Sequence, residues 1–104
     1  MPMGPWITSA DEAGDPQTLR IRTWVNGELR QDTNTADMIF PVADLIAFLS
    51  GSMTLLPGTV ILTGTPSGVG MGMNPRQYLA PGDTMEVDIE QLGVLRNPIT
   101  EECL

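Results

Sequence analysis

The sequence predicts a β-dominated α+β domain, and three patterns support this fold class. Several short segments place apolar residues at every second position, which is the period of a half-buried strand. One segment has the three-to-four-residue spacing of an amphipathic helix. Asn-Gly and Pro-Gly pairs separate these segments and mark turns. At 104 residues the chain is long enough for a single domain, residues 1–104, with one modest core.

A β-hairpin is predicted first. Residues 19–25 alternate between a mostly apolar face and a face that carries two arginines. Asn26 and Gly27 follow, and residues 28–31 can return as the second strand. Because both central residues of a type I′ turn need positive φ, Asn-Gly is the strongest short-range signal for such a hairpin.

Three further strands are expected, which makes about five in all. Residues 59–63 are β-branched and apolar, which is typical of a buried strand. Residues 85–90 alternate after a Pro-Gly turn, and residues 94–96 can pair with them as a second hairpin.

One helix is predicted over residues 41–50. Pro41 suits the first helical position, where a missing N–H has no cost, and Asp44 suits the positive end of the helix dipole. Gly51 supplies the stop. The apolar stripe expected to face the core consists of Val42, Leu45, Ile46 and Leu49.

Composition excludes several classes of function. The chain has no histidine and no lysine, so a Ser-His-Asp triad, a Schiff-base lysine and a Walker A loop cannot be built within it. Cys103 is the single cysteine, which excludes an internal disulfide, and we expect it to be inert. The net charge of −8 argues against nucleic acid and anionic membranes as partners. We expect a soluble, cytoplasmic protein.

The glycine-rich segment over residues 64–72 is the most informative stretch. Glycine allows a backbone to approach a ligand closely, and Thr65 adds a hydroxyl where a strand is expected to end. The spacing does not fit a dinucleotide fingerprint, and no helix is expected to follow. From the residues alone, a ligand-binding loop and a plain connecting loop remain equal alternatives.

Two charged clusters each have a functional and a structural interpretation. Glu86, Asp88 and Glu90 share one strand face and could hold a metal ion, but a solvated face is favoured.

The second cluster consists of arginines. Arg20 and Arg22 share a face, with Arg30 expected across from them. They could grip a substrate carboxylate. Ion pairs are favoured instead, with partners expected among Asp11, Glu12 and Asp15.

Several segments together resemble the C-terminal part of the fumarylacetoacetate hydrolase family. They include Gly4-Pro5-Trp6 and the Asn-Gly-Glu and Arg-Gln-Asp steps of residues 26–32. The other matching segments are residues 34–40, 60–70 and 95–98, in the order and spacing typical of the family.

The resemblance implies a mixed β-sandwich roll and a homodimer or larger assembly. It also implies a Mg²⁺ or Mn²⁺ cofactor and acylpyruvate-like or other 2-oxo acid substrates. Members carry out C–C bond hydrolysis, isomerisation or decarboxylation, with the ion acting as a Lewis acid that stabilises an enolate.

The family's carboxylate metal ligands and its lysine precede the Gly-Pro-Trp segment, and this chain has no such positions. The functional position that carries over is Thr65 within Gly64-Thr65-Pro66, which by resemblance would contact substrate through its hydroxyl and backbone N–H. We therefore expect an enzyme's C-terminal portion that is inactive without its N-terminal half. The alternative is a non-catalytic β-rich module that complements a separate half or only mediates assembly.

Overall fold

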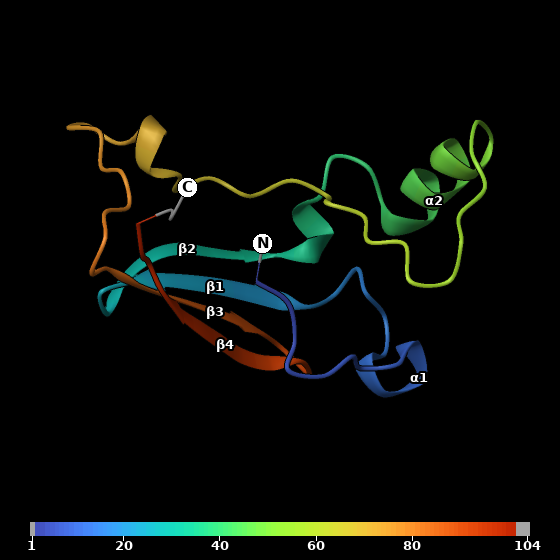
Figure 1. Cartoon of the computed structure of the whole chain (residues 1–104). Coiled ribbons are helices and arrows are strands. Elements are labelled where there is room, and N and C mark those ends of the chain that lie inside the picture. The colour runs from blue at the N-terminus through green and yellow to red at the C-terminus, as the bar shows by residue number, and fades with distance from the viewer. Residues whose placement is uncertain (1, 102–104) are drawn as a thin grey trace.

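The computed structural model of the protein describes residues 2–101, and Cys103 lies outside them. The described chain forms a four-stranded antiparallel sheet with the order β2-β1-β3-β4 (Figure 1). The strands are β1 Arg20–Val25, β2 Glu28–Asn34, β3 Thr84–Ile89 and β4 Gly93–Pro98. The helices are α1 Ala10–Ala13, α2 Val42–Ser50 and the 3₁₀ turns η1 Thr35–Asp37 and η2 Gly70–Gly72. The β-dominated α+β class is confirmed.

Both predicted hairpins form. Asn26 and Gly27 have φ of 51° and 81°, as a type I′ turn between β1 and β2 requires. The turn is also tied to the start of β3, because the Asn26 N–H donates to the Thr84 carbonyl at 2.9 Å. Strand β2 extends to Asn34, beyond the residue range predicted for it.

Helix α2 begins one residue later than predicted. Pro41 is its N-cap, with an extended ψ of 156°, rather than its first helical residue. Three members of the predicted stripe are half-buried, whereas Ile46 is 45% exposed. Figure 1 shows α2 to one side of the sheet. None of the helices within residues 2–101 is long and apolar enough to cross a membrane.

The predicted strand over residues 59–63 does not form. The segment is irregular, and the side chains of Val60 and Leu62 are 53% and 75% exposed. A strand needs a neighbouring strand for its backbone hydrogen bonds. Neither edge strand of the sheet formed by the described residues, β2 or β4, pairs with this segment, so Val60 and Leu62 stay exposed and the sheet has four strands rather than five.

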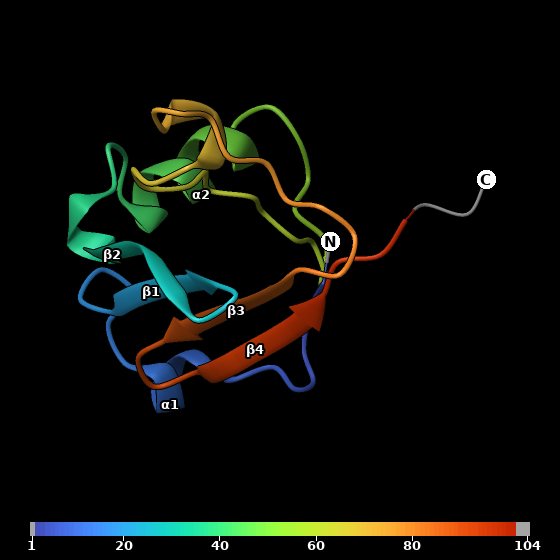
Figure 2. The ribbon, with the colours of Figure 1, turned by 90° about the vertical axis from the view of Figure 1, so that its left-hand side faces the viewer.

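The fold has two layers, a sheet and an irregular cover. Figure 1 and Figure 2 show the segment that follows α2 passing above the sheet, whereas α2 itself lies to one side of it in Figure 1. Leu19 and Thr23, each 8% exposed, are the buried residues within the described part of the chain. The core is therefore very small for a chain of this length.

Candidate functional site

A β-bulge shapes the second strand. Thr23 pairs with Gln31 and Trp24 pairs with Leu29, so Arg30 is an extra residue in β2. A bulge re-aims the side chains beside it. As a result Arg30 and Gln31, although adjacent in sequence, line the same pocket.

The expected position of Arg30, across from Arg20 and Arg22, is wrong. In a two-residue turn the pairing of Trp24 with Leu29 places the next residue of β2 on the face of Thr23. The register of the turn could have shown this from the sequence. The position of Gln31 depends on the bulge, for which the sequence carries no clear signal.

Arg20 and Arg22 lie on the opposite face and form ion pairs. Arg20 Nη2 is 2.7 Å from Asp32 Oδ2, and Arg22 pairs with Asp88 on β3. The hydrogen bond from Arg20 lowers the pKa of Asp32 below its ordinary value. The favoured ion-pair interpretation is confirmed for these two arginines. The expected partners were wrong, because the strand register selects Asp32 and Asp88 rather than the acids of the lead-in.

The three acidic side chains on and just after β3 are engaged in ion pairs and a backbone hydrogen bond. Glu86 Oε1 is 3.2 Å from Arg96 Nε, and Glu90 Oε2 accepts from the Arg20 backbone N–H at 3.1 Å. Asp88 forms an ion pair with Arg22, so all three carboxylates have partners. No group of three or more metal-binding side chains occurs within residues 2–101. The residues described do not fit the divalent ion that the resemblance implies.

The glycine-rich segment packs closely against β2 and against the chain that follows it. A Cβ at Gly68 would overlap the Arg30 carbonyl oxygen, and a Cβ at Gly70 would overlap the Gln77 carbonyl oxygen. The Gln77 N–H also donates to the Gly70 carbonyl at 2.9 Å. These two glycines therefore allow close contact between backbone segments of the protein itself. For them the plain connecting-loop interpretation holds, since no ligand is needed to explain the absence of a side chain.

Gln31 joins the Gly-Thr-Pro step to β2. Its Nε2 donates to Thr65 Oγ1 at 2.9 Å and to the Pro66 carbonyl at 3.0 Å. Thr65 itself is exposed, and Gly64 has a φ of 96° that favours glycine. Gln31 belongs to the Arg-Gln-Asp step that carries part of the family resemblance, but it was not predicted as a site residue.

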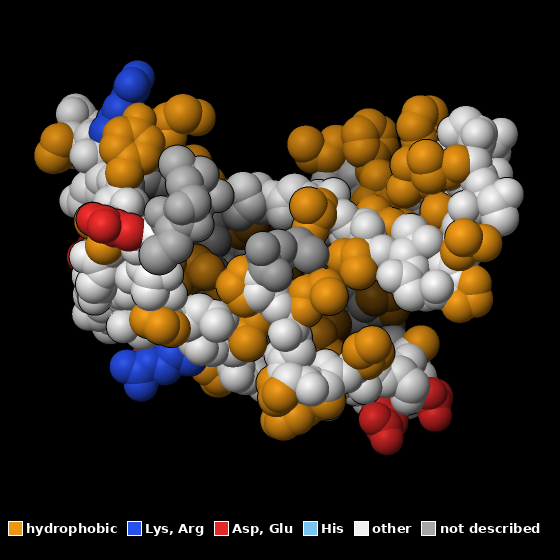
Figure 3. All heavy atoms as spheres, in the orientation of Figure 1, with side chains coloured by type: hydrophobic (Ala, Val, Ile, Leu, Met, Phe, Trp, Pro, Cys, Tyr) orange, Lys and Arg blue, Asp and Glu red, His pale blue; other side chains and the backbone are white. Residues whose placement is uncertain are grey.

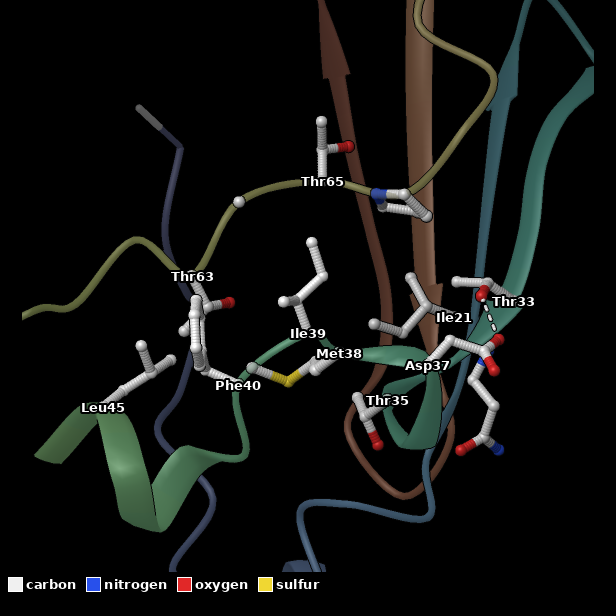
Figure 4. A pocket seen from close by; sticks show the side chains of 13 residues that line it. Ile21, Thr33, Thr35, Asp37, Met38, Ile39, Phe40, Leu45, Thr63 and Thr65 are labelled. Atoms are coloured by element: carbon white, nitrogen blue, oxygen red, sulfur yellow. Dashed lines mark hydrogen bonds between the residues drawn. The ribbon is translucent and has the colours of Figure 1, made fainter.

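Thr65 lines two pockets. The first, of about 330 Å³, is mostly apolar and is shown in Figure 4. Its apolar wall includes Ile39 and Phe40, and Thr33 donates to Asp37 at its polar end at 2.7 Å. In Figure 4 the Thr65 side chain points away from Ile39, so this pocket meets mainly the backbone of the Gly-Thr-Pro step.

The second pocket, of about 620 Å³, is lined by Thr65, Gln31 and two arginines, Arg30 and Arg76. Asp83 also lines it, but its oxygens accept from Asn26 Nδ2 and the Ala80 N–H, both at 2.8 Å. These bonds, the Asn26 bond first, lower the pKa of Asp83. The polar and cationic groups suit an anionic ligand better than the first pocket does.

Arg30 is the most enclosed arginine of this pocket. Its side chain is 14% exposed, and its Nη2 is 3.4 Å from Glu28 Oε2. Its Nη1 contacts Met73 Sδ, while its buried Nε has no hydrogen-bond partner within residues 2–101. An unpaired buried donor is costly, so a polar group from a ligand or from further chain would be favoured there.

Comparison with known proteins places this chain in a family. The model described as fumarylacetoacetate (FAA) hydrolase C-terminal matches residues 1–100. The 2,4-didehydro-3-deoxy-L-rhamnonate hydrolase of Sphingomonas sp. (strain SKA58) is 50% identical over 101 residues, covering 96% of this chain and 35% of that protein. The mitochondrial oxaloacetate tautomerase of Rattus norvegicus is 46% identical, over 94% of this chain and 31% of that protein.

Solved structures agree in fold. The fumarylacetoacetate hydrolase of Exiguobacterium antarcticum has a TM-score of 0.91 and 46% identity, over 97% of this chain and 36% of that one. Maleylpyruvate hydrolase from Sphingobium sp. SYK-6, in complex with manganese(II) and pyruvate, has a TM-score of 0.84 and 42% identity, over 93% and 34%.

The chain belongs to the fumarylacetoacetate hydrolase family, and it has that family's fold in the part it covers. It spans about a third of the length of the curated relatives it matches.

Proposed function

We propose that this chain provides the substrate-binding Gly64-Thr65-Pro66 step of an enzyme that acts on acylpyruvate-like or other 2-oxo acids. The carrying observation is the position of the exposed Thr65 on a pocket that also contains Arg30 and Arg76. A hydroxyl and two guanidinium groups are suited to the oxygens of a carboxylate. Binding of pyruvate by the Sphingobium relative supports this substrate class.

The rest of the active site is proposed to come from chain beyond these 104 residues. The relatives are about three times longer, and the residues described do not form a metal site. We propose that this further chain supplies the Mg²⁺ or Mn²⁺ ligands and the acid-base groups. Homo-oligomers and a cytoplasmic location remain part of this proposal. Which reaction occurs depends on those further residues, since the relatives include hydrolases and a tautomerase.

A chimera tests the role of Thr65. Residues 1–101 of this chain replace the matching region of the Sphingomonas hydrolase, and kcat/KM is measured with that enzyme's substrate. Thr65→Val should lower kcat/KM about 10- to 100-fold, because a hydrogen bond to a charged group contributes about 1.5–3 kcal/mol. Thr65→Ser should retain most of the activity.

Thr59→Val is the matched control, because Thr59 is exposed and lines neither pocket. An active chimera in which Thr65→Val and Thr59→Val behave alike would contradict the proposal. That result would favour the alternative in which this part of the protein only mediates assembly.

A further inference from the structure

We propose that Gln31 is a positioning residue that makes the Thr65 hydroxyl a hydrogen-bond donor toward a substrate oxygen. The inference rests on the proposed function, since it assigns a direction to the contact that Thr65 makes. Gln31 itself need not touch the substrate.

The orientation of the Gln31 carboxamide follows from its partners. The Pro66 carbonyl can only accept a hydrogen bond, so the group that faces it at 3.0 Å must be the amide nitrogen. The same nitrogen lies 2.9 Å from Thr65 Oγ1. Because Nε2 carries two hydrogens, it can serve both acceptors at once.

The polarity of the Thr65 hydroxyl follows in turn. A hydroxyl has one proton to donate and two lone pairs that accept. One lone pair is taken by Gln31, and the amide offers no acceptor on that side. The proton of Thr65 is therefore directed elsewhere, and the second pocket, which Thr65 also lines, is open to it.

The support for Gln31 is rigid. The β-bulge brings Gln31 to the pocket side of the sheet, paired with the buried Thr23. Gly68 lies so close that a Cβ there would come within 3.0 Å of Gln31 Cγ, as well as overlapping the Arg30 carbonyl. Such packing leaves the carboxamide little freedom to rotate away from Thr65.

This geometry predicts that the pocket prefers ligands with hydrogen-bond acceptors over ligands with donors. A donor hydroxyl beside Arg30 and Arg76 favours a ligand atom that only accepts, such as a carboxylate or keto oxygen. A ligand that presents an ammonium group at this place would leave the Thr65 proton without a partner.

The direct test uses NMR on the chimera described above, because the isolated chain is expected to associate. Thr65→Val should shift one Nε2 proton of Gln31 and speed its exchange with water, while Thr59→Val should leave both protons unchanged. If Thr65→Val has no effect on either Gln31 proton, the hydrogen bond is absent and the proposal is wrong.

The functional test is a double-mutant cycle in the chimera described above. Gln31→Leu removes the hydrogen bond and frees the Thr65 hydroxyl to rotate. Gln31→Glu would accept the Thr65 proton and so reverse the direction of the hydrogen bond. Each variant should lower kcat/KM about tenfold. Gln31→Leu should not lower it further when Thr65 is already valine, whereas Gln31→Glu also adds a negative charge to the pocket and should lower it in either background. Gln91→Glu adds the same charge at an exposed turn residue and should leave kcat/KM unchanged.

The outcomes separate the two proposals. A large effect of Thr65→Val with a fully additive or absent effect of Gln31→Leu overturns the positioning role alone. No effect of Thr65→Val overturns the proposed function and, with it, the functional part of this inference.

Discussion

Asp83 connects several elements of the fold. Its carboxylate accepts from the hairpin turn through Asn26 and from the Ala80 N–H. Its backbone carbonyl accepts from the Ile99 N–H at 2.8 Å, just after β4. The side chain and the backbone carbonyl of this one residue therefore join the first hairpin, the turn before β3 and the end of the sheet.

This arrangement predicts a loss of stability in acid. Because the folded pKa of Asp83 is below its ordinary value of 3.8, its ionised form stabilises the fold above about pH 4. That stabilisation should disappear as the pH falls through the lower, folded pKa. Thermal unfolding followed by circular dichroism between pH 6 and pH 2.5 measures it.

Asp83→Asn is the comparison, since an amide cannot accept from both donors with two oxygens. The variant should be less stable at pH 6 and should lose less on acidification. Parallel melting curves for the two proteins across this range would argue against the assignment.

At the scale of elements, the contact between the glycine-rich segment and β2 sets the site. It depends on Gly68, where a side chain would meet backbone, and on the bulge that presents Arg30 and Gln31. Hydrogen bonds from Gln31 complete it. The loop is thus held by β2, in which the bulge at Arg30 changes the face to which the neighbouring side chains point.

Two glycines allow this contact to be measured. Gly68 and Gly82 have similar φ, 103° and 97°, but a Cβ at Gly82 would meet nothing within 4 Å. Gly82→Ala should lower the free energy of unfolding by about 1 kcal/mol, from backbone conformation alone. Gly68→Ala should cost about 1–3 kcal/mol more, because backbone atoms must move apart.

Urea unfolding monitored by tryptophan fluorescence gives both values. Equal losses for the two variants would mean that the loop does not pack on β2 as described.

How far the sequence predicts these elements depends on where their partners lie. The hairpin at Asn26-Gly27 and helix α2 were predictable because turn chemistry and periodicity are local. Residues 59–63 were mispredicted because a strand depends on a neighbour, and apolar patterning does not say whether one is present. At the site, Gly64 and Thr65 came from resemblance, whereas Gln31 required knowledge of the bulge.

On the scale of the whole molecule, the described fold is too open for its mass. The accessible surface is 8079 Å², against about 5700 Å² expected for a folded monomer of 11.2 kDa. The radius of gyration is 15.4 Å, against about 13 Å expected. Figure 3 shows hydrophobic side chains gathered on this surface, with one group at upper right, over α2. Ile39, Phe48 and Leu62 are each at least 75% exposed.

Such a surface predicts association of the isolated chain. An excess of about 2400 Å² is comparable to the area buried in large obligate interfaces. The purified 104 residues should sediment as concentration-dependent oligomers and bind a hydrophobic dye, and they should show no turnover of acylpyruvates. Phe48→Ser should weaken the association. A dye-free monomer at high concentration, or measurable turnover, would contradict this view.

The bulge in β2 has a consequence for protein engineering. Deleting Arg30 would restore a regular ladder, but it would also remove a pocket cation. Moving the extra residue beyond Gln31 would turn Gln31 to the other side of the sheet. The loop over residues 64–70 is therefore not a portable module. Any transplant onto a new scaffold has to carry the irregular strand with it, because the loop's working geometry is encoded partly in another segment of the chain.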